Sequence, residues 1–207
     1  MAKAGPKQYG TTSGDRPVPG ADQVRERLVD ATIRVLARDG LAQASARAIA
    51  TEAGSANGLI FYHFGSMDGL LAATARALGD RGIERIRAGL GGDAAHVEWS
   101  NRLAGVIRRE ADGDDGRAVM ELMVGSRTSP LLADEMRATI GRALDFATNE
   151  LRMLVSGTPL EQVLPVELFA ELAAATFLGL EVMTLNGREI DLDTLADRLG
   201  TLLRAFT

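Results

Sequence analysis

Apolar residues recur every three or four positions along nearly the whole chain of 207 residues, and no run alternates with a period of two between hairpin turns. A first helix is predicted over about residues 22–39, where Gly40 is placed to end it. A last helix is predicted from about Asp191, where leucines recur at spacings of three and four. The intervening helices are predicted at about residues 46–53, 57–63, 67–90, 95–110, 117–126, 130–155 and 165–185. The pattern therefore predicts an all-α fold of about nine helices.

The residue types that most enzymes depend on are scarce. The chain has no cysteine, which excludes disulfides, thiolate catalysis and cysteine-ligated zinc. Its two histidines, His63 and His96, belong to no Ser-His-Asp order and to no metal-binding H-E-x-x-H helix. No phosphate loop of the G-x-x-x-x-G-K type is present. We expect neither catalysis nor a metal ion or cofactor.

Two segments bear on where the protein resides. Residues 1–20 have no apolar core of a secretion signal, and their Pro, Gly, Ser and Thr content predicts a disordered tail. The most apolar window, residues 168–185, contains Glu171 and Glu181, each of which is costly to place in lipid. We therefore expect this window to be a buried helix of a cytoplasmic protein.

The charge of the chain is unevenly divided. Residues 1–65 hold eight Lys and Arg against six Asp and Glu, while residues 66–207 hold fifteen against twenty-two. A mildly basic N-terminal part on an acidic body permits a polyanionic partner at the N-terminal part alone.

Two short helices behind a longer one form the pattern of a helix-turn-helix. Ser45 can cap the first short helix, Gly54 can end it, and Ser66 can cap the long helix that follows the second. In such a motif the second short helix enters the major groove of DNA, and the first crosses the backbone.

The stretch SARAIATEAGSANGLIFYHFGSMDGLL, residues 45–71, resembles the DNA-binding signature of the tetracycline-repressor-like (TetR) family of bacterial transcription regulators. The resemblance covers about residues 24–71, and implies a repressor that binds palindromic operator DNA as a homodimer and responds to a small molecule. Domains are accordingly expected at residues 21–66 for DNA binding and 67–207 for ligand binding and dimerisation, after a tail of residues 1–20.

The sequence departs from the usual family pattern at two positions. Met67 stands where lysine is common, and Asn57 where a basic residue is frequent, so the second short helix has no Lys or Arg. Because non-specific affinity depends on neutralised phosphates, we expect weak non-specific binding and a shallow salt dependence. Lys3, Lys7 and Arg16 of the tail could compensate by following the DNA backbone.

The aromatic cluster in the second short helix divides into two expected roles. Phe61 and Phe64, with Ile60, are expected in the core. The polar ends of Tyr62 and His63 can reach phosphates, a role that the family resemblance implies; the alternative is that both are partly exposed residues without that role. The residues expected at DNA are Ser45, Arg47, Asn57, Gly58, Leu59, Tyr62 and His63. Asn57 suits adenine, Leu59 suits a thymine methyl group and Arg47 suits a phosphate or guanine, unless it is a solvated surface arginine.

The family resemblance also implies a ligand pocket and a dimer interface in the C-terminal part. The candidate ligand residues are Trp99, Leu103, Met120, Met123, Arg127, Phe146 and Phe177, and most of them could instead be ordinary core. The candidate interface residues are Leu168, Leu172, Ala175, Val182, Leu195, Leu199 and Leu202. Gly69, Gly79 and Gly82 weaken the long helix after the motif, which we expect to act as the lever between ligand and DNA. The alternative is a helical small-molecule-binding protein that has lost DNA affinity.

Overall fold

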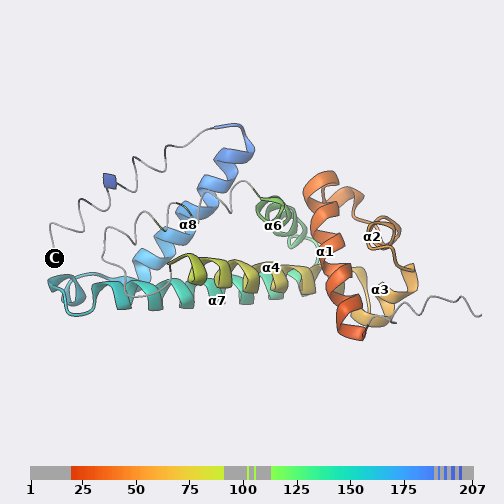
Figure 1. The fold of residues 1–207 in the computed structure, drawn as a ribbon, viewed down its shortest axis with the longest axis horizontal. Coiled ribbons are helices and arrows are strands. Elements are labelled where there is room, and N and C mark those ends of the chain that lie inside the picture. Colours follow the sequence, from red (N-terminus) through yellow and green to blue (C-terminus); the bar gives the residue numbers. More distant parts are fainter. Residues whose placement is uncertain are drawn as a thin grey trace, which may run out of the picture.

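The computed structural model describes residues 20–90 and 113–188, together with the isolated residues 102, 105, 191, 194, 197, 198 and 201. Within these residues the chain is helical and forms no strand, as the sequence predicts (Figure 1). The elements are α1 (Ala21–Asp39), η1 (Leu41–Gln43), α2 (Ala46–Glu52), α3 (Asn57–Phe64), α4 (Met67–Leu90), α6 (Asp114–Gly125), α7 (Pro130–Val155), η2 (Pro159–Gln162) and α8 (Val166–Leu185). The helices predicted over residues 95–110 and from Asp191 lie outside the described residues.

Local capping sets the helix ends around the helix-turn-helix. The Oγ atom of Ser45 accepts a hydrogen bond from the Ala48 amide at 3.2 Å, and that of Ser66 accepts one from the Gly69 amide at 2.9 Å. Each serine satisfies an amide that has no partner inside its own helix. Gly65 ends α3 with φ of 75°, a conformation that glycine adopts at little cost. The predicted ends of these helices are therefore confirmed to within about one residue.

The start of α6 differs from the sequence prediction. The helix begins at Asp114, before the predicted start at Arg117. Asp114 and Asp115 occupy its first turn, where negative side chains interact favourably with the positive end of the helix dipole. The predicted boundaries of α7 are those observed, with Ser129 capping and Pro130 at the first turn.

One hydrophobic core joins the head, which we define as residues 20–66, to the body, residues 67–188. Helix α1 packs against α2 and α4, and also against α6 of the body. The largest fully buried apolar side chains of this core are Leu28, Leu36, Ile49, Ile60, Leu70, Leu122 and Leu132. Burying each of these contributes roughly 1.5–3 kcal/mol, so the head is held firmly against α4 and α6 of the body.

Helices α4 and α7 run lengthwise beside each other, and α8 packs on α7 (Figure 1). Glu135 of α7 is buried and accepts a hydrogen bond from Nε of Arg76 of α4 at 3.1 Å. The hydrogen bonding and charge of Arg76 lower the pKa of Glu135. The two helices approach closely at Gly79, where an added Cβ would lie 2.2 Å from Cγ2 of Thr139. In the described part of the chain, no helix is both long enough and apolar enough to cross a membrane.

Candidate nucleic-acid interface and ligand cavity

Helix α3 is anchored on one side and exposed on the other. Ile60 is fully buried, and Leu59 is half-buried against the same core. Asn57, Gly58 and Tyr62 are exposed, and Tyr62 keeps 80% of its surface accessible. An exposed amide and phenol on a short helix can reach base edges or phosphates. Because Leu59 is half-buried, less of its side chain is available to DNA than the sequence prediction assumed.

The turn between α2 and α3 fixes how α3 is presented. Gly54 adopts φ of 59°, in the left-handed region that favours glycine. The following amide, of Ser55, donates to the carbonyl oxygen of Ala50 at 2.8 Å. This bond closes the end of α2 and directs the chain into α3, so the two short helices form the motif that the sequence predicts.

The prediction that Phe61 and Phe64 both belong to the core is wrong for Phe61. Phe61 is 50% exposed, whereas Phe64 is half-buried against the core. Successive residues of a helix are about 100° apart, so Ile60 and Phe64 share the inner side and Phe61 lies at its edge.

Arg25 of α1 secures the C-terminal end of α3, a role that sequence reasoning missed. Its guanidinium carbon lies 4.6 Å from the centroid of the Phe64 ring. Its Nη1 atom donates to the carbonyl oxygen of His63 at 2.6 Å. The contact joins residues 38 positions apart in the sequence, so no local pattern could have indicated it. The side chain of His63 itself is half-buried.

The arginines of the head differ in how far they are already paired. Glu52 binds Arg34 at 2.7 Å and Arg38 at 3.0 Å, and hydrogen bonds from these arginines lower the pKa of Glu52. Arg47 is exposed at the start of α2 and forms no hydrogen bond or ion pair with any residue that the structure describes. Ser45 is exposed beside it, although its hydroxyl oxygen is engaged in the helix cap. Arg47 is therefore available to a polyanion near the motif.

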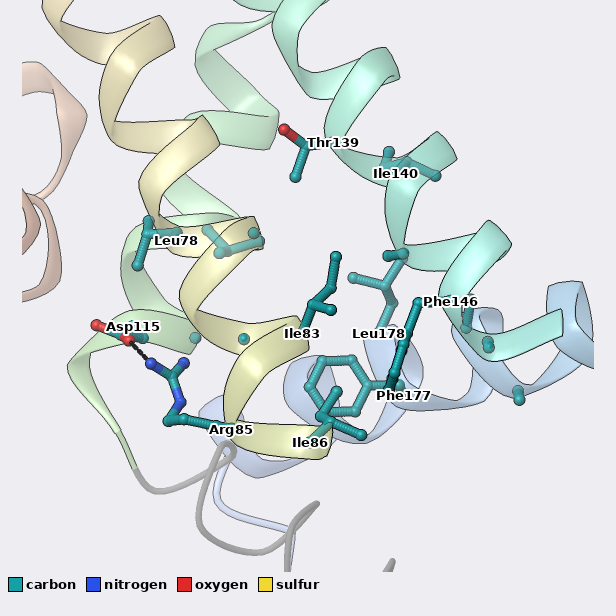
Figure 2. A pocket seen from close by; sticks show the side chains of 18 of the residues that line it. Leu78, Ile83, Arg85, Ile86, Asp115, Thr139, Ile140, Phe146, Phe177 and Leu178 are labelled. Atoms are coloured by element: carbon teal, nitrogen blue, oxygen red, sulfur yellow. Dashed lines mark ion pairs between the residues drawn. The ribbon is translucent and has the colours of Figure 1, made fainter. Parts of the chain in front are cut away.

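A cavity of about 320 Å³ lies in the body between α4, α6, α7 and α8 (Figure 2). Figure 2 labels the apolar side chains Leu78, Ile83, Ile86, Ile140, Phe146, Phe177 and Leu178 around it. Its size and its largely apolar lining suit a small organic molecule.

Several of the residues predicted to meet a ligand line this cavity. They are Met120, Met123, Phe146 and Phe177. Arg127 does not line it, because α6 ends at Gly125 and Arg127 is exposed on the turn toward α7. Trp99 and Leu103 lie outside the described residues. The placement fits the predicted role of the first four, and ligand binding itself stays a prediction.

Few polar groups border the cavity. Arg85 of α4 and Asp115 of α6 form an ion pair of 2.9 Å at one end (Figure 2). Thr139 and Glu150 of α7 are the other polar residues of the described lining. In the described ranges, no three potential ligand side chains are grouped so that they could hold a metal ion.

Helix α8 carries an exposed apolar surface. Leu168, Leu172, Ala175 and Val182, the predicted interface residues of this helix, are all exposed. The other predicted interface residues, Leu195, Leu199 and Leu202, lie outside the described residues.

The side of α8 that faces the body does not include the predicted interface residues, and in the single chain the expected burial of this helix is met on that side only. The side facing the body includes the buried residues Val166 and Ala170 and, at the cavity, Ala174 and Phe177. Packing against α7 selects this side, and leaves Phe169 exposed as well.

Helix α6 connects the cavity to the head. Val119 and Met123 line the cavity, while Ala118 of the same helix is fully buried in the core shared with α1. An Oε2 atom of Glu121 accepts a hydrogen bond from the Leu41 amide of the head at 2.7 Å. Helix α6 therefore contacts both the cavity and the part of the head formed by α1 and η1.

These features define a helix-turn-helix protein whose helical body encloses an apolar cavity. Residues 28–74 match the model of the bacterial regulatory proteins of the tetR family, so this part of the chain is similar to the DNA-binding region of that family.

A relative and two solved structures extend the comparison. An uncharacterised HTH-type transcriptional regulator of Mycobacterium tuberculosis is 29% identical over 116 residues, which are 56% of this chain and 60% of that protein. The chain thus spans about 60% of the length of this curated relative. A transcriptional regulator from Rhodococcus sp. Rha1 has a TM-score of 0.69 and 24% identity over 86% of this chain and 95% of that one. The fatty acid degradation regulator FadR from Bacillus halodurans has a TM-score of 0.69 and 21% identity, covering 86% and 96%. The two structures establish likeness of fold alone.

Proposed function

We propose that this protein is a sequence-specific DNA-binding transcriptional regulator, and that it represses transcription until a small apolar or amphipathic molecule releases it. The observation that carries the proposal is the outward side of α3, where Asn57, Gly58 and Tyr62 are exposed behind a fully buried Ile60. The family match over residues 28–74 covers this helix. Such a regulator acts in the bacterial cytoplasm, where the chromosome lies.

The proposal includes a homodimer on palindromic operator DNA. The exposed Leu168, Leu172 and Val182 of α8 support an interface with a second copy of the chain. Two α3 helices about 34 Å apart would then enter successive major grooves on one side of the duplex. In this scheme residues 21–66 bind DNA, residues 67–207 bind ligand and dimerise, and residues 1–20 form a tail.

Release by a ligand is supported by the position of the cavity. It lies against α4, which follows the motif directly, and against α6, which also contacts the head. Consider two arrangements of the protein, one that binds DNA and one in which α4 and α6 are displaced. A molecule that binds the displaced arrangement more tightly would shift the population toward it, and the size of the shift is set by the ratio of its affinities for the two arrangements.

Selection of bound sequences from random duplex DNA tests the proposal. We expect an enriched palindrome, and expect Asn57→Ala to relax the preference at one position in each half-site. Arg47→Ala should reduce the slope of log affinity against log salt by about 0.9 for one lost phosphate contact. The matched control is Arg152→Ala, which removes the same charge near the end of α7 that is far from the head (Figure 1). It should leave the slope unchanged.

The alternative function predicts a different result. The head holds five arginines and five carboxylates, and two of those arginines are paired with Glu52. This balance favours weak attraction to DNA. If no sequence is enriched even at low salt while small molecules still bind the cavity, the chain is a small-molecule-binding protein and the regulator proposal is wrong.

A further inference from the structure

Among the residues that the structure describes, the charges of the side chains that border the cavity do not cancel. Arg85 and Asp115 form an ion pair of 2.9 Å, so their charges offset each other. Thr139 is neutral, and its hydroxyl oxygen accepts a hydrogen bond from Arg142 at 2.9 Å. Glu150 is the remaining polar residue of the described lining, and it brings one negative charge.

Glu150 lies on the cavity side of α7. The lining residues Ala143, Phe146, Ala147, Glu150 and Leu151 recur at intervals of three and four, which places them on one side of the helix. Glu150 is half-buried and forms no hydrogen bond or ion pair with the residues that the structure describes. A carboxylate that is partly removed from water without a partner is unfavourable, and a bound cation would relieve that cost.

Aromatic rings stand beside this carboxylate. Phe146 precedes Glu150 by four residues, so the two side chains are neighbours on the helix surface. Phe177 of α8 borders the same end of the cavity as Phe146 (Figure 2). The Phe146 ring already attracts one cation, because the guanidinium carbon of Arg87 lies 5.2 Å from its centroid. That arginine is itself paired with Glu84 at 2.5 Å and does not line the cavity.

We propose that the cavity takes an amphipathic monocation, with its apolar part against the lining and its ammonium group beside Glu150 and Phe146. The inference rests on the proposed function, which supplies a ligand for the cavity, and it narrows the class of that ligand. A fatty acid or another anionic amphiphile is disfavoured, since its head would face Glu150 or would have to break the ion pair of Arg85 and Asp115.

Three probes that share one alkyl chain isolate the charge of the head group. Octyltrimethylammonium, 1-octanol and octyl sulfate are titrated calorimetrically into the full chain, below the concentrations at which they form micelles. We expect the ammonium compound to bind about tenfold more tightly than octanol, and octyl sulfate to bind more weakly than both, in line with a cation held by a carboxylate and an aromatic ring.

Variants then assign the preference to one carboxylate. Glu150→Gln should remove most of the tenfold advantage of the ammonium probe and leave octanol binding unchanged. The control is Glu171→Gln, which removes the same charge from an exposed position of α8 outside the cavity lining, and it should retain the full preference.

The possible outcomes separate this inference from the proposed function. If octanol binds but the ammonium probe has no advantage, or if Glu150→Gln keeps the advantage, the inference is overturned and an apolar effector remains. If none of the three probes binds, the inference fails together with the ligand-release part of the proposed function, while DNA binding is unaffected. The comparison of the ammonium probe with octanol and octyl sulfate on the unsubstituted chain decides the matter even if Glu150→Gln fails to fold.

Discussion

Substitution of Gly79 by alanine is expected to destabilise the protein, although alanine is the better helix former. In the interior of a helix, alanine is favoured over glycine by about 1 kcal/mol. At Gly79 the new Cβ would lie 2.2 Å from Cγ2 of Thr139, far inside normal contact. Thr139 is held in place, because its Oγ1 atom accepts a hydrogen bond from Arg142 at 2.9 Å and lies 3.4 Å from an oxygen of Glu135. Overpacking of this kind costs about 1–3 kcal/mol, so we expect a net loss of about 1 kcal/mol.

The free energy of unfolding, measured by urea denaturation, tests this expectation, and two further variants separate its parts. Gly141→Ala is the matched control, because a Cβ added there on α7 meets no atom within 4 Å. It should stabilise the protein by up to about 1 kcal/mol. Thr139→Ser removes the clashing methyl group and keeps the hydroxyl, so the double variant with Gly79→Ala should recover at least about 1 kcal/mol of coupling energy.

Two outcomes would refute the reasoning. Gly79→Ala could prove as stabilising as Gly141→Ala, or the effects of Gly79→Ala and Thr139→Ser could add without coupling. Either result would mean that α4 and α7 are not in close contact at this point.

Three further predictions concern coupling, pH and salt. Glu121→Ala should lower the free energy of unfolding in urea by about 1.5 kcal/mol, because it leaves the Leu41 amide without its charged partner. Glu121→Gln should lower it clearly less, and equal losses for the two variants would contradict the assigned hydrogen bond. The pKa of Glu135 is lowered in the folded state by Arg76, so its stabilisation is present above the unfolded pKa of about 4.3 and is lost as pH falls through the folded value. The unsubstituted chain should therefore lose stability relative to Glu135→Gln between about pH 5 and pH 3 in urea titrations, and parallel profiles would count against this role. Removal of residues 1–19, which carry three Lys and Arg, should reduce the salt slope in gel-shift assays by up to about 2.7, and an unchanged slope would exclude the tail from DNA.

The parts of the fold that depend on local chemistry could be predicted from the sequence. Helix ends depend on neighbouring residues: a serine before a helix, a proline in its first turn and a glycine after its last turn each act on adjacent backbone groups. The bounds of α7 and the caps of α2 and α4 could therefore be predicted from the sequence. The outward placement of Asn57 and Tyr62 also followed from spacing around Ile60.

The parts that depend on contacts between distant elements could not be predicted. A helix as short as α3 fits more than one assignment of its inner side, and Phe61 was assigned wrongly for that reason. The pairing of Arg34 and Arg38 with Glu52 depends on how α1 packs on α2. The negative charge of the cavity lining could not be predicted either. It follows only once Arg85 of α4 is known to form an ion pair with Asp115 of α6, which leaves Glu150 as the remaining charged residue of the described lining.

Helix α6 both lines the cavity and packs against α1, and this restricts which substitutions it can accept during evolution. A substitution on α6 that reshapes the cavity also alters the surface on which α1 rests, so mutations there tend to trade new chemical recognition against control of the head. Helix α8 and the last turns of α7 border the cavity away from that surface. If the proposed function holds, substitutions in this region can change which compound the protein responds to without altering the surface on which α1 rests, so a designer of biosensors should begin to randomise there.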